Sequence, residues 1–191
     1  MSPRLPSPTS VRPPPDATVR ASDLVLSLTR YKAWADADLI ATVLALPALV
    51  DTPEGGYVTA IVRHFHTVDC IFKAHLLGIP HGYTSVNPAE PATLSELQPR
   101  VAAIDEWYVR YAHDVDPRDL GQALPVRFMD GQEQVLTRSD ILLHVSLHGA
   151  GHRGNVNLLI RKLGAEPPQD RFTSYLRRRS STPEPSASFS R

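Results

Sequence analysis

Two histidines four residues apart, His148 and His152, are the clearest chemical feature of the 191-residue sequence. At about 100° per residue, both fall inside an apolar stripe of helical spacing. The stripe consists of Ile141, Val145, Val156, Leu159 and Leu163. Histidines at i and i+4 point to one side of a helix and can bind the same metal ion. The alternative is a pair of core histidines bonded to the backbone or to each other, and the pattern lacks the glutamate of the HExxH zinc proteases.

A third ligand should come from a neighbouring helix, and the segment around His64 and His66 offers two candidates. The apolar stripe of that segment consists of Ile61, Phe65, Val68, Phe72 and Leu76. His64 lies about 80° from the centre of this stripe and His66 about 120° from it. The periodicity therefore favours His64 as a ligand, and we expect His66 to face solvent or to line a groove. We expect His144, one turn before His148, to be an outer hydrogen-bond partner or a structural residue, because a catalytic metal usually keeps one position open.

Three further features near these histidines each have more than one interpretation. Asp69 could orient a ligand or take a proton, or it could be a surface or helix-pairing carboxylate. Arg153 could bind an anionic substrate group or form an ordinary salt bridge. Three glycines in the segment of His148 cost that helix roughly 1 kcal/mol each relative to alanine, so a helix, a second subunit or a substrate should approach its backbone closely. They are Gly149, Gly151 and Gly154.

Four long helical segments must position these side chains. Apolar residues at spacings of three and four predict helices over residues 21–46, 57–77, 93–113 and 140–163. The predicted buried face of the first helix consists of Leu24, Leu28, Tyr31, Ala35, Leu39 and Val43. We expect Ser139 to cap the last long helix and residues 51–56 to form a loop.

The segment before the last long helix has a different pattern. Asp130 and Gly131 lie between two short alternating stretches, which predicts a β-hairpin. A short closing helix is expected from residue 170 or 171 to residue 177. The predicted fold class is therefore all-α: a four-helix bundle with a short β-hairpin before the last long helix.

The formal net charge is zero, but the charges are unevenly distributed. Residues 1–20 and 171–191 contain 8 basic and 2 acidic residues, whereas residues 21–170 contain 12 basic and 18 acidic residues. An acidic body is a poor partner for nucleic acid, and no apolar run is long enough to span a membrane. The single cysteine, Cys70, cannot form an intrachain disulfide and favours a cytoplasmic location.

The composition also predicts the domain organisation. We expect one domain over residues 21–177, since about 150 residues suit a single core. Residues 1–20 are expected to be a disordered N-terminal extension, and residues 178–191 a disordered basic tail, because both are rich in proline and poor in apolar side chains.

Several segments together resemble the DinB family. Tyr31-Lys-Ala-Trp34-Ala-Asp36 resembles the Tyr-x-x-Trp-x-Asn signature of that family, and IVRHFHTVDCIFKAHLLG resembles its second helix. The stretch LLHVSLHGAGHRGNVNLLIRKLG is similar to its His-x-x-x-His-Arg-Gly segment. Asp36 stands where asparagine is usual, and Gly151 stands where a histidine often precedes the second ligand. We expect the glycine to alter the wall of the pocket.

The resemblance covers about residues 22–177 and implies a four-helix bundle with a metal held by three histidines. The matching positions are His64, His148 and His152. It also implies a homodimer and a relation to thiol-dependent transferases and isomerases that use bacillithiol, mycothiol or glutathione.

Three neutral imidazoles suit Zn²⁺ or Ni²⁺ and leave the ion an open position. The main hypothesis is a metal-dependent thiol transferase, whose partners would be a low-molecular-weight thiol and an electrophile. Two alternatives stay open at this stage. One is a metal-assisted hydrolase, and the other is a non-catalytic metal-binding protein of the stress response.

Overall fold

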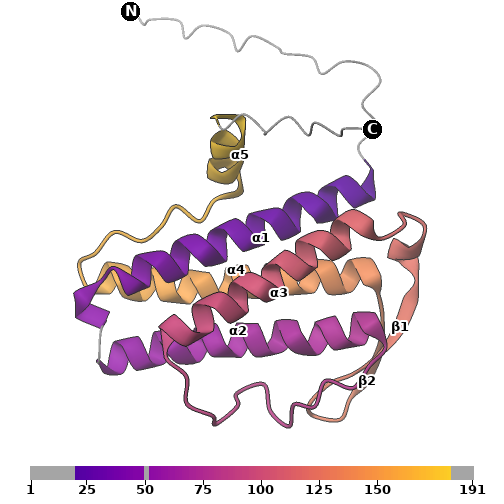
Figure 1. Ribbon diagram of the computed structural model, residues 1–191, viewed down its shortest axis with the longest axis horizontal. Coiled ribbons are helices and arrows are strands. Elements are labelled where there is room, and N and C mark those ends of the chain that lie inside the picture. The colour runs from indigo at the N-terminus through magenta and orange to yellow at the C-terminus, as the bar shows by residue number, and fades with distance from the viewer. Residues whose placement is uncertain (1–19, 50–51, 182–191) are drawn as a thin grey trace, which may run out of the picture.

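Four long helices pack side by side in the computed structural model, which describes residues 20–49 and 52–181 (Figure 1). A fifth, shorter helix lies against the first, and a two-stranded antiparallel sheet precedes the fourth. The helices are α1 (Ala21–Leu44), α2 (Pro53–Leu77), α3 (Leu94–Asp114), α4 (Arg138–Lys162) and α5 (Phe172–Ser181). Two 3₁₀ turns, η1 (Pro47–Leu49) and η2 (Asp119–Gly121), occur between them. The predicted helical bundle with a hairpin before its last long helix is confirmed.

The starts of two helices differ from the prediction. The helix expected from residue 57 begins at Pro53, because the Thr52 hydroxyl accepts a hydrogen bond from the Gly55 N–H at 3.1 Å and proline suits a first turn. Most of the predicted loop over residues 51–56 is therefore helical; residue 51 itself lies outside the described residues. The cap of α4 is Thr137 rather than Ser139, because Thr137 and Asp140 form a reciprocal capping box.

The hairpin consists of β1 (Ala123–Arg127) and β2 (Glu133–Thr137), paired in register from Ala123–Thr137 to Arg127–Glu133. Gly131 has φ of 85° in the turn between the strands, a conformation that favours glycine. One buried side chain of the hairpin, Val126, belongs to the core cluster that includes Phe72 of α2. The turn therefore folds back toward α2 and α4.

The C-terminal helix is longer than predicted. It runs to Ser181, so residues 178–181 are helical although a disordered tail was expected from residue 178. The Arg178 guanidinium lies 5.6 Å from the centre of the Trp34 ring on α1, which accounts for the extra turn. The remainder of that predicted tail and residues 1–19 of the predicted N-terminal extension lie outside the described residues.

Buried charges connect all four long helices. The Lys32 ammonium on α1 forms ion pairs with Asp36 at 2.8 Å, with Asp69 of α2 at 2.7 Å and with Asp105 of α3. Arg153 of α4 forms an ion pair with Asp36 at 2.7 Å. All five side chains are at most 4% exposed. These helices are thus joined by a buried network as well as by apolar packing.

The network holds more carboxyl groups than cations. Asp170, which follows α4, accepts a second hydrogen bond from Arg153 at 2.8 Å and one from the Tyr31 hydroxyl. Lys32 and Arg153 therefore face four carboxyl groups. Burial raises the pKa of Asp69 to about 6 and raises that of Asp105 as well, despite the nearby ammonium. The network should consequently retain a proton near neutral pH.

This excess of carboxyl groups predicts a pH-dependent stability. A carboxyl group whose folded pKa lies above its unfolded value stabilises the fold at low pH, and that stability is lost as the pH rises through the folded pKa. Ionisation of Asp69 should lower the free energy of unfolding between about pH 4 and 6, and ionisation of Asp105 should continue this decrease at higher pH. Each group contributes up to about 1.4 kcal/mol per pH unit. We expect Asp105→Asn, which imitates the protonated acid, to unfold in urea with a shallower loss of free energy from pH 5 to 9.

Glu106→Gln is the control for this measurement, because Glu106 is exposed on the same helix. An Asp105→Asn variant with the same pH slope as the unmodified protein would contradict the retained proton.

In residues 20–49 and 52–181, no helix combines the length and the apolar character needed to cross a membrane.

Candidate metal centre

Three histidines from two helices converge between α2 and α4. The Nε2 atom of His148 lies 3.3 Å from Nε2 of His64 and 3.1 Å from Nε2 of His152. The ligand atoms of all three residues lie within 4.8 Å of one another. All three side chains are partly buried, and the ring of His64 meets the His152 ring edge-on at 4.7 Å. The structure thus brings together the three residues that the sequence predicts as ligands.

The separation of the nitrogen atoms fits a single ion. Zinc–imidazole bonds of about 2.0–2.1 Å at tetrahedral angles place neighbouring nitrogen atoms about 3.3–3.4 Å apart. Burial and the neighbouring imidazoles lower the pKa of His148 to about 3, and burial lowers that of His152. Neutral imidazole is the form that binds a metal. The three residues could therefore hold a divalent cation.

The loop after α2 orients one of these rings. Nδ1 of His64 lies 3.2 Å from the carbonyl oxygen of Val86 and 3.0 Å from Oδ1 of Asn87. A carbonyl oxygen only accepts hydrogen bonds, so Nδ1 carries the proton and the lone pair is on Nε2, facing the other two histidines. Such outer hydrogen bonds fix the tautomer and the direction of a metal-binding histidine. No helical or strand periodicity could point to Asn87, because the residue lies in an irregular loop.

Asn87→Ala is expected to weaken metal binding about tenfold. This is the smallest loss of affinity usual for removal of an outer hydrogen-bond partner, because the Val86 carbonyl still orients the ring. The affinity can be measured by competition with a chromophoric chelator. Asn155→Ala, an exposed change on α4, is the control. An Asn87→Ala affinity equal to that of the unmodified protein would show that the loop does not orient His64.

Two other histidines near the centre lie outside the cluster. The His144 ring stacks on His148 with centroids 5.5 Å apart and packs against Phe72 at 4.6 Å. His66 is half-buried, and its Nε2 lies 3.7 Å from Sγ of Cys70. Burial lowers the pKa of His66 to about 4. His144 is therefore placed as a neighbour of a candidate ligand, and His66 is turned toward a different part of α2.

Asp69 and Arg153, for which the sequence left two interpretations open, both belong to the buried network. The carboxylate of Asp69 pairs with Lys32, and its Oδ1 has no hydrogen-bond partner among the described residues. Arg153 is fully buried between Asp36 and Asp170. The helix-pairing interpretation thus holds for Asp69, and the salt-bridge interpretation holds for Arg153.

The glycines of α4 have different surroundings. A Cβ atom at Gly149 would lie 3.2 Å from an Arg153 nitrogen and 3.5 Å from Cε of Lys32, so this glycine lets α4 approach the side chain of α1 closely. At Gly151 and Gly154 a Cβ atom would meet nothing within 4 Å. Gly151 is exposed on the outer side of α4, so the expectation that it alters the pocket wall is wrong.

A hollow of about 350 Å³ opens beside His64 and His148. The loop after α2 contributes Val86, and the hairpin contributes Arg127 and its turn. The other hairpin residues of the lining are Val126, Phe128, Met129 and Asp130. The helices α2 and α4 contribute Val68, Ile71, Phe72, His75 and His144 in addition to the two ligands. The surface next to the three histidines is thus mostly apolar, with Arg127 and Asp130 as its charged members.

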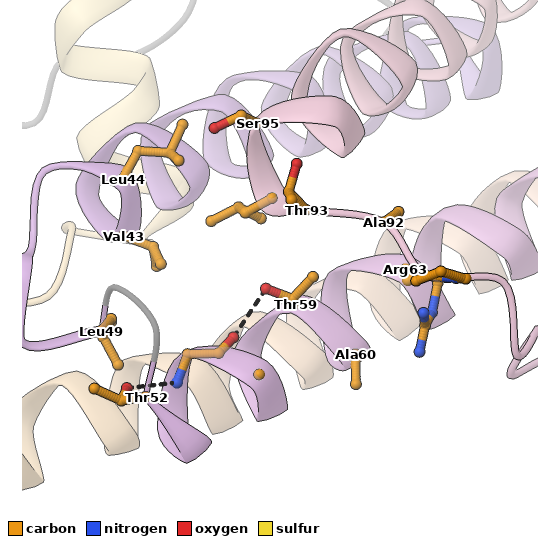
Figure 2. A pocket seen from close by; sticks show the side chains of 14 residues that line it. Val43, Leu44, Leu49, Thr52, Thr59, Ala60, Arg63, Ala92, Thr93 and Ser95 are labelled. Atoms are coloured by element: carbon orange, nitrogen blue, oxygen red, sulfur yellow. Dashed lines mark hydrogen bonds between the residues drawn. The ribbon is translucent and has the colours of Figure 1, made fainter.

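A second hollow, of about 530 Å³, lies on another surface, where the end of α1 meets the starts of α2 and α3 (Figure 2). Figure 2 shows Thr59 and Arg63 on the α2 side of this hollow and Thr93 at the start of α3. The three clustered histidines are absent from its lining. This larger hollow therefore offers no obvious metal ligand, and the chemistry of the described residues concentrates around His148.

A comparison with known protein families agrees with the observed fold. A family model described as the DinB family matches residues 25–185, which is most of the chain. No curated protein and no solved structure matches the sequence. The matched region contains α1 from Val25 onward, the other three long helices and the three clustered histidines. The chain belongs to the DinB family.

Proposed function

We propose that this protein is a metal-dependent thiol transferase in which His64, His148 and His152 hold Zn²⁺ or Ni²⁺. The observation that carries the proposal is the convergence of three Nε2 atoms beside a mostly apolar hollow. A set of three nitrogen ligands suits these borderline ions and not Mg²⁺ or Ca²⁺. The proposed partners are a low-molecular-weight thiol and an electrophile, the proposed location is the cytoplasm, and the proposed assembly is a homodimer.

An ion bound by three neutral histidines keeps its positive charge and an open position, and it would lower the pKa of a thiol bound there. The overall exchange is balanced: the thiol loses its proton, its sulfur forms a bond to carbon, and the leaving group departs with its bonding electrons. The chain keeps His148 and His152 neutral through burial, so both can serve as ligands at pH 7. Asn87 and Val86 hold His64 in the matching tautomer.

The hollow beside the cluster suggests how the electrophile binds. Apolar side chains such as Phe72 and Ile71 would cover its apolar part and exclude water from the reacting sulfur. Arg127, on the exposed hairpin, would face an anionic group of either substrate. Burial lowers the pKa of His144, so this neutral imidazole in the lining could accept a proton next to His148.

The experiment is a conjugation assay with protein loaded with Zn²⁺ or Ni²⁺. Bacillithiol, mycothiol, glutathione and cysteine are each supplied with monochlorobimane, and formation of the fluorescent adduct is followed. We expect at least one thiol to react faster with loaded protein than with metal-free protein, and His148→Ala to remove the difference. Conjugation at the uncatalysed rate with every thiol, from protein shown to contain metal, would overturn the proposal.

A further inference from the structure

The outer side of α4 carries an apolar face that no described residue covers. Leu143, Leu147 and Leu158 are 38%, 67% and 53% exposed. With Gly151 and Gly154 they fall within an arc of about 80° on the helix, whose centre lies about 120° around the helix from the centre of His148 and His152. Large exposed apolar side chains gathered on one helix face are typical of an interaction surface.

The two glycines at the centre of this face are unexplained within the chain. A side chain at Gly151 or Gly154 would meet only open space, whereas Gly149 is required by the packing of α1. Glycine in the middle of a helix weakens the helix, so two of them on an open surface indicate that another backbone or side chain approaches there. The leucines beside them supply the apolar surface that such a contact would bury.

The residues of the face are arranged symmetrically about the midpoint between Ala150 and Gly151. In an antiparallel pair of α4 helices related by a twofold axis at this point, Leu143 lies opposite Leu158 of the second copy. Leu147 lies opposite Gly154, and Ala150 lies opposite Gly151. Leucine therefore packs against leucine toward the ends of the pair, and Leu147 packs over a glycine nearer its centre. Each contact is repeated by the twofold axis, as in a self-complementary interface.

The charges at the two ends of α4 follow the same symmetry. Asp140 and Arg161 are equidistant from the midpoint, are both exposed, and lie on the same side of the helix as the leucines. The Asp140 carboxylate accepts hydrogen bonds from Thr137, which lower its pKa and keep it charged. Arg161 forms no ion pair with another described residue. In the antiparallel pair each Asp140 faces an Arg161 of the second copy, so opposite charges meet at both ends.

We propose that this α4 face, consisting of Leu143, Leu147, Gly151, Gly154 and Leu158, is the dimer interface, with a second copy of the chain packed antiparallel on it. The inference rests on the proposed homodimer and names its surface. It is independent of the proposed thiol chemistry, because the centre of the face lies about 120° around the helix from the centre of His148 and His152. Each α4 would carry ligands on one side and bind its partner helix with the other.

The first test measures the mass of the full chain by light scattering and by sedimentation over a range of concentrations. We expect a dimer for the unmodified protein, and Leu147→Glu should raise the dimer dissociation constant by about a hundredfold or more, since the change occurs twice in the interface. Val135→Glu is the matched control, because Val135 is 70% exposed on the hairpin and outside this face. An unmodified chain that is monomeric at all concentrations would contradict both the dimer and its interface.

A dimer that persists in Leu147→Glu would leave the homodimer standing and overturn its placement on α4. Gly154→Leu gives a second measurement that does not depend on loss of an apolar side chain. The leucine side chain would extend into open space within one chain, and leucine favours helix more than glycine does, so the thermal midpoint of the monomer should not fall. In the dimer the same side chain would collide with Leu147 of the second copy, so dimerisation should weaken. Unchanged dimerisation of a folded Gly154→Leu protein would also overturn the interface.

The register is tested by cross-linking in a Cys70→Ser background, which removes the native thiol. Leu147→Cys combined with Gly154→Cys should form a disulfide-linked dimer under mild oxidation, because these positions face each other across the axis. Leu147→Cys combined with Leu158→Cys is the control, one helical turn out of register and too distant for the narrow range of disulfide geometry. Equal cross-linking in the two proteins would contradict the antiparallel register.

Discussion

Replacing His148 with alanine is expected to weaken the binding of Zn²⁺ or Ni²⁺ by about a hundredfold or more. His148 is the central member of the cluster, since its Nε2 lies 3.3 Å from that of His64 and 3.1 Å from that of His152. Zinc sites with four protein ligands bind with about 10–16 kcal/mol, so the loss of one ligand removes roughly 3 kcal/mol, which is about two orders of magnitude in affinity. The variant also leaves two ligands that rarely retain an ion alone.

Metal content after loading and gel filtration is the measurement, and His144→Ala is its matched control. His144 lies one turn earlier on the same helix and stacks on the His148 ring, but it is outside the cluster. We expect His144→Ala to retain about one ion per chain and His148→Ala to retain almost none. Equal retention by the two variants would show that the cluster is not the metal site.

Replacing Lys32 with methionine is expected to lower the free energy of unfolding by about 3–5 kcal/mol, because it leaves buried carboxylates without their cation. The Lys32 ammonium is 1% exposed and pairs with Asp36, Asp69 and Asp105, which come from three helices. Methionine retains much of the volume of lysine, so the change tests charge rather than packing. Such a loss is a large part of the 5–15 kcal/mol that stabilises a typical domain.

Urea unfolding followed by circular dichroism measures this effect at pH 7. Lys162→Met is the control, because Lys162 is exposed at the end of α4. The metal should be removed from all proteins first, since a bound ligand stabilises the folded state by mass action. If Lys32→Met unfolds at the same urea concentration as the unmodified protein, the buried charges do not hold the helices together.

The candidate ligands could be predicted from sequence because helical periodicity carries direct information about direction. The stripe beginning at Ile61 favoured His64 over His66, and the structure places His64, but not His66, in the cluster. The bundle and its hairpin could be predicted for the same reason, together with the turn residues Asp130 and Gly131. The DinB resemblance selected the same histidine of α2 as the periodicity did.

The buried network was not predicted, because hydrophobic patterns assign charged residues to the surface. On α1 the pattern included Leu24 in the buried face, yet Leu24 is 58% exposed, while Lys32 and Asp36 are buried. A buried lysine is stable only with carboxylates from other helices, and their meeting depends on tertiary packing. Asn87 was missed for a related reason: its contact with His64 depends on the path of a loop that has no periodicity.

The most direct measurement of the central claim is anomalous diffraction from crystals of the Zn²⁺-loaded protein, recorded on both sides of the zinc absorption edge. We predict one strong anomalous peak per chain, about 2.0–2.1 Å from Nε2 of each of His64, His148 and His152, with a further coordination position open to solvent or thiol. A fully loaded protein whose anomalous peak lies elsewhere, with no peak among these three nitrogen atoms, would contradict the claim.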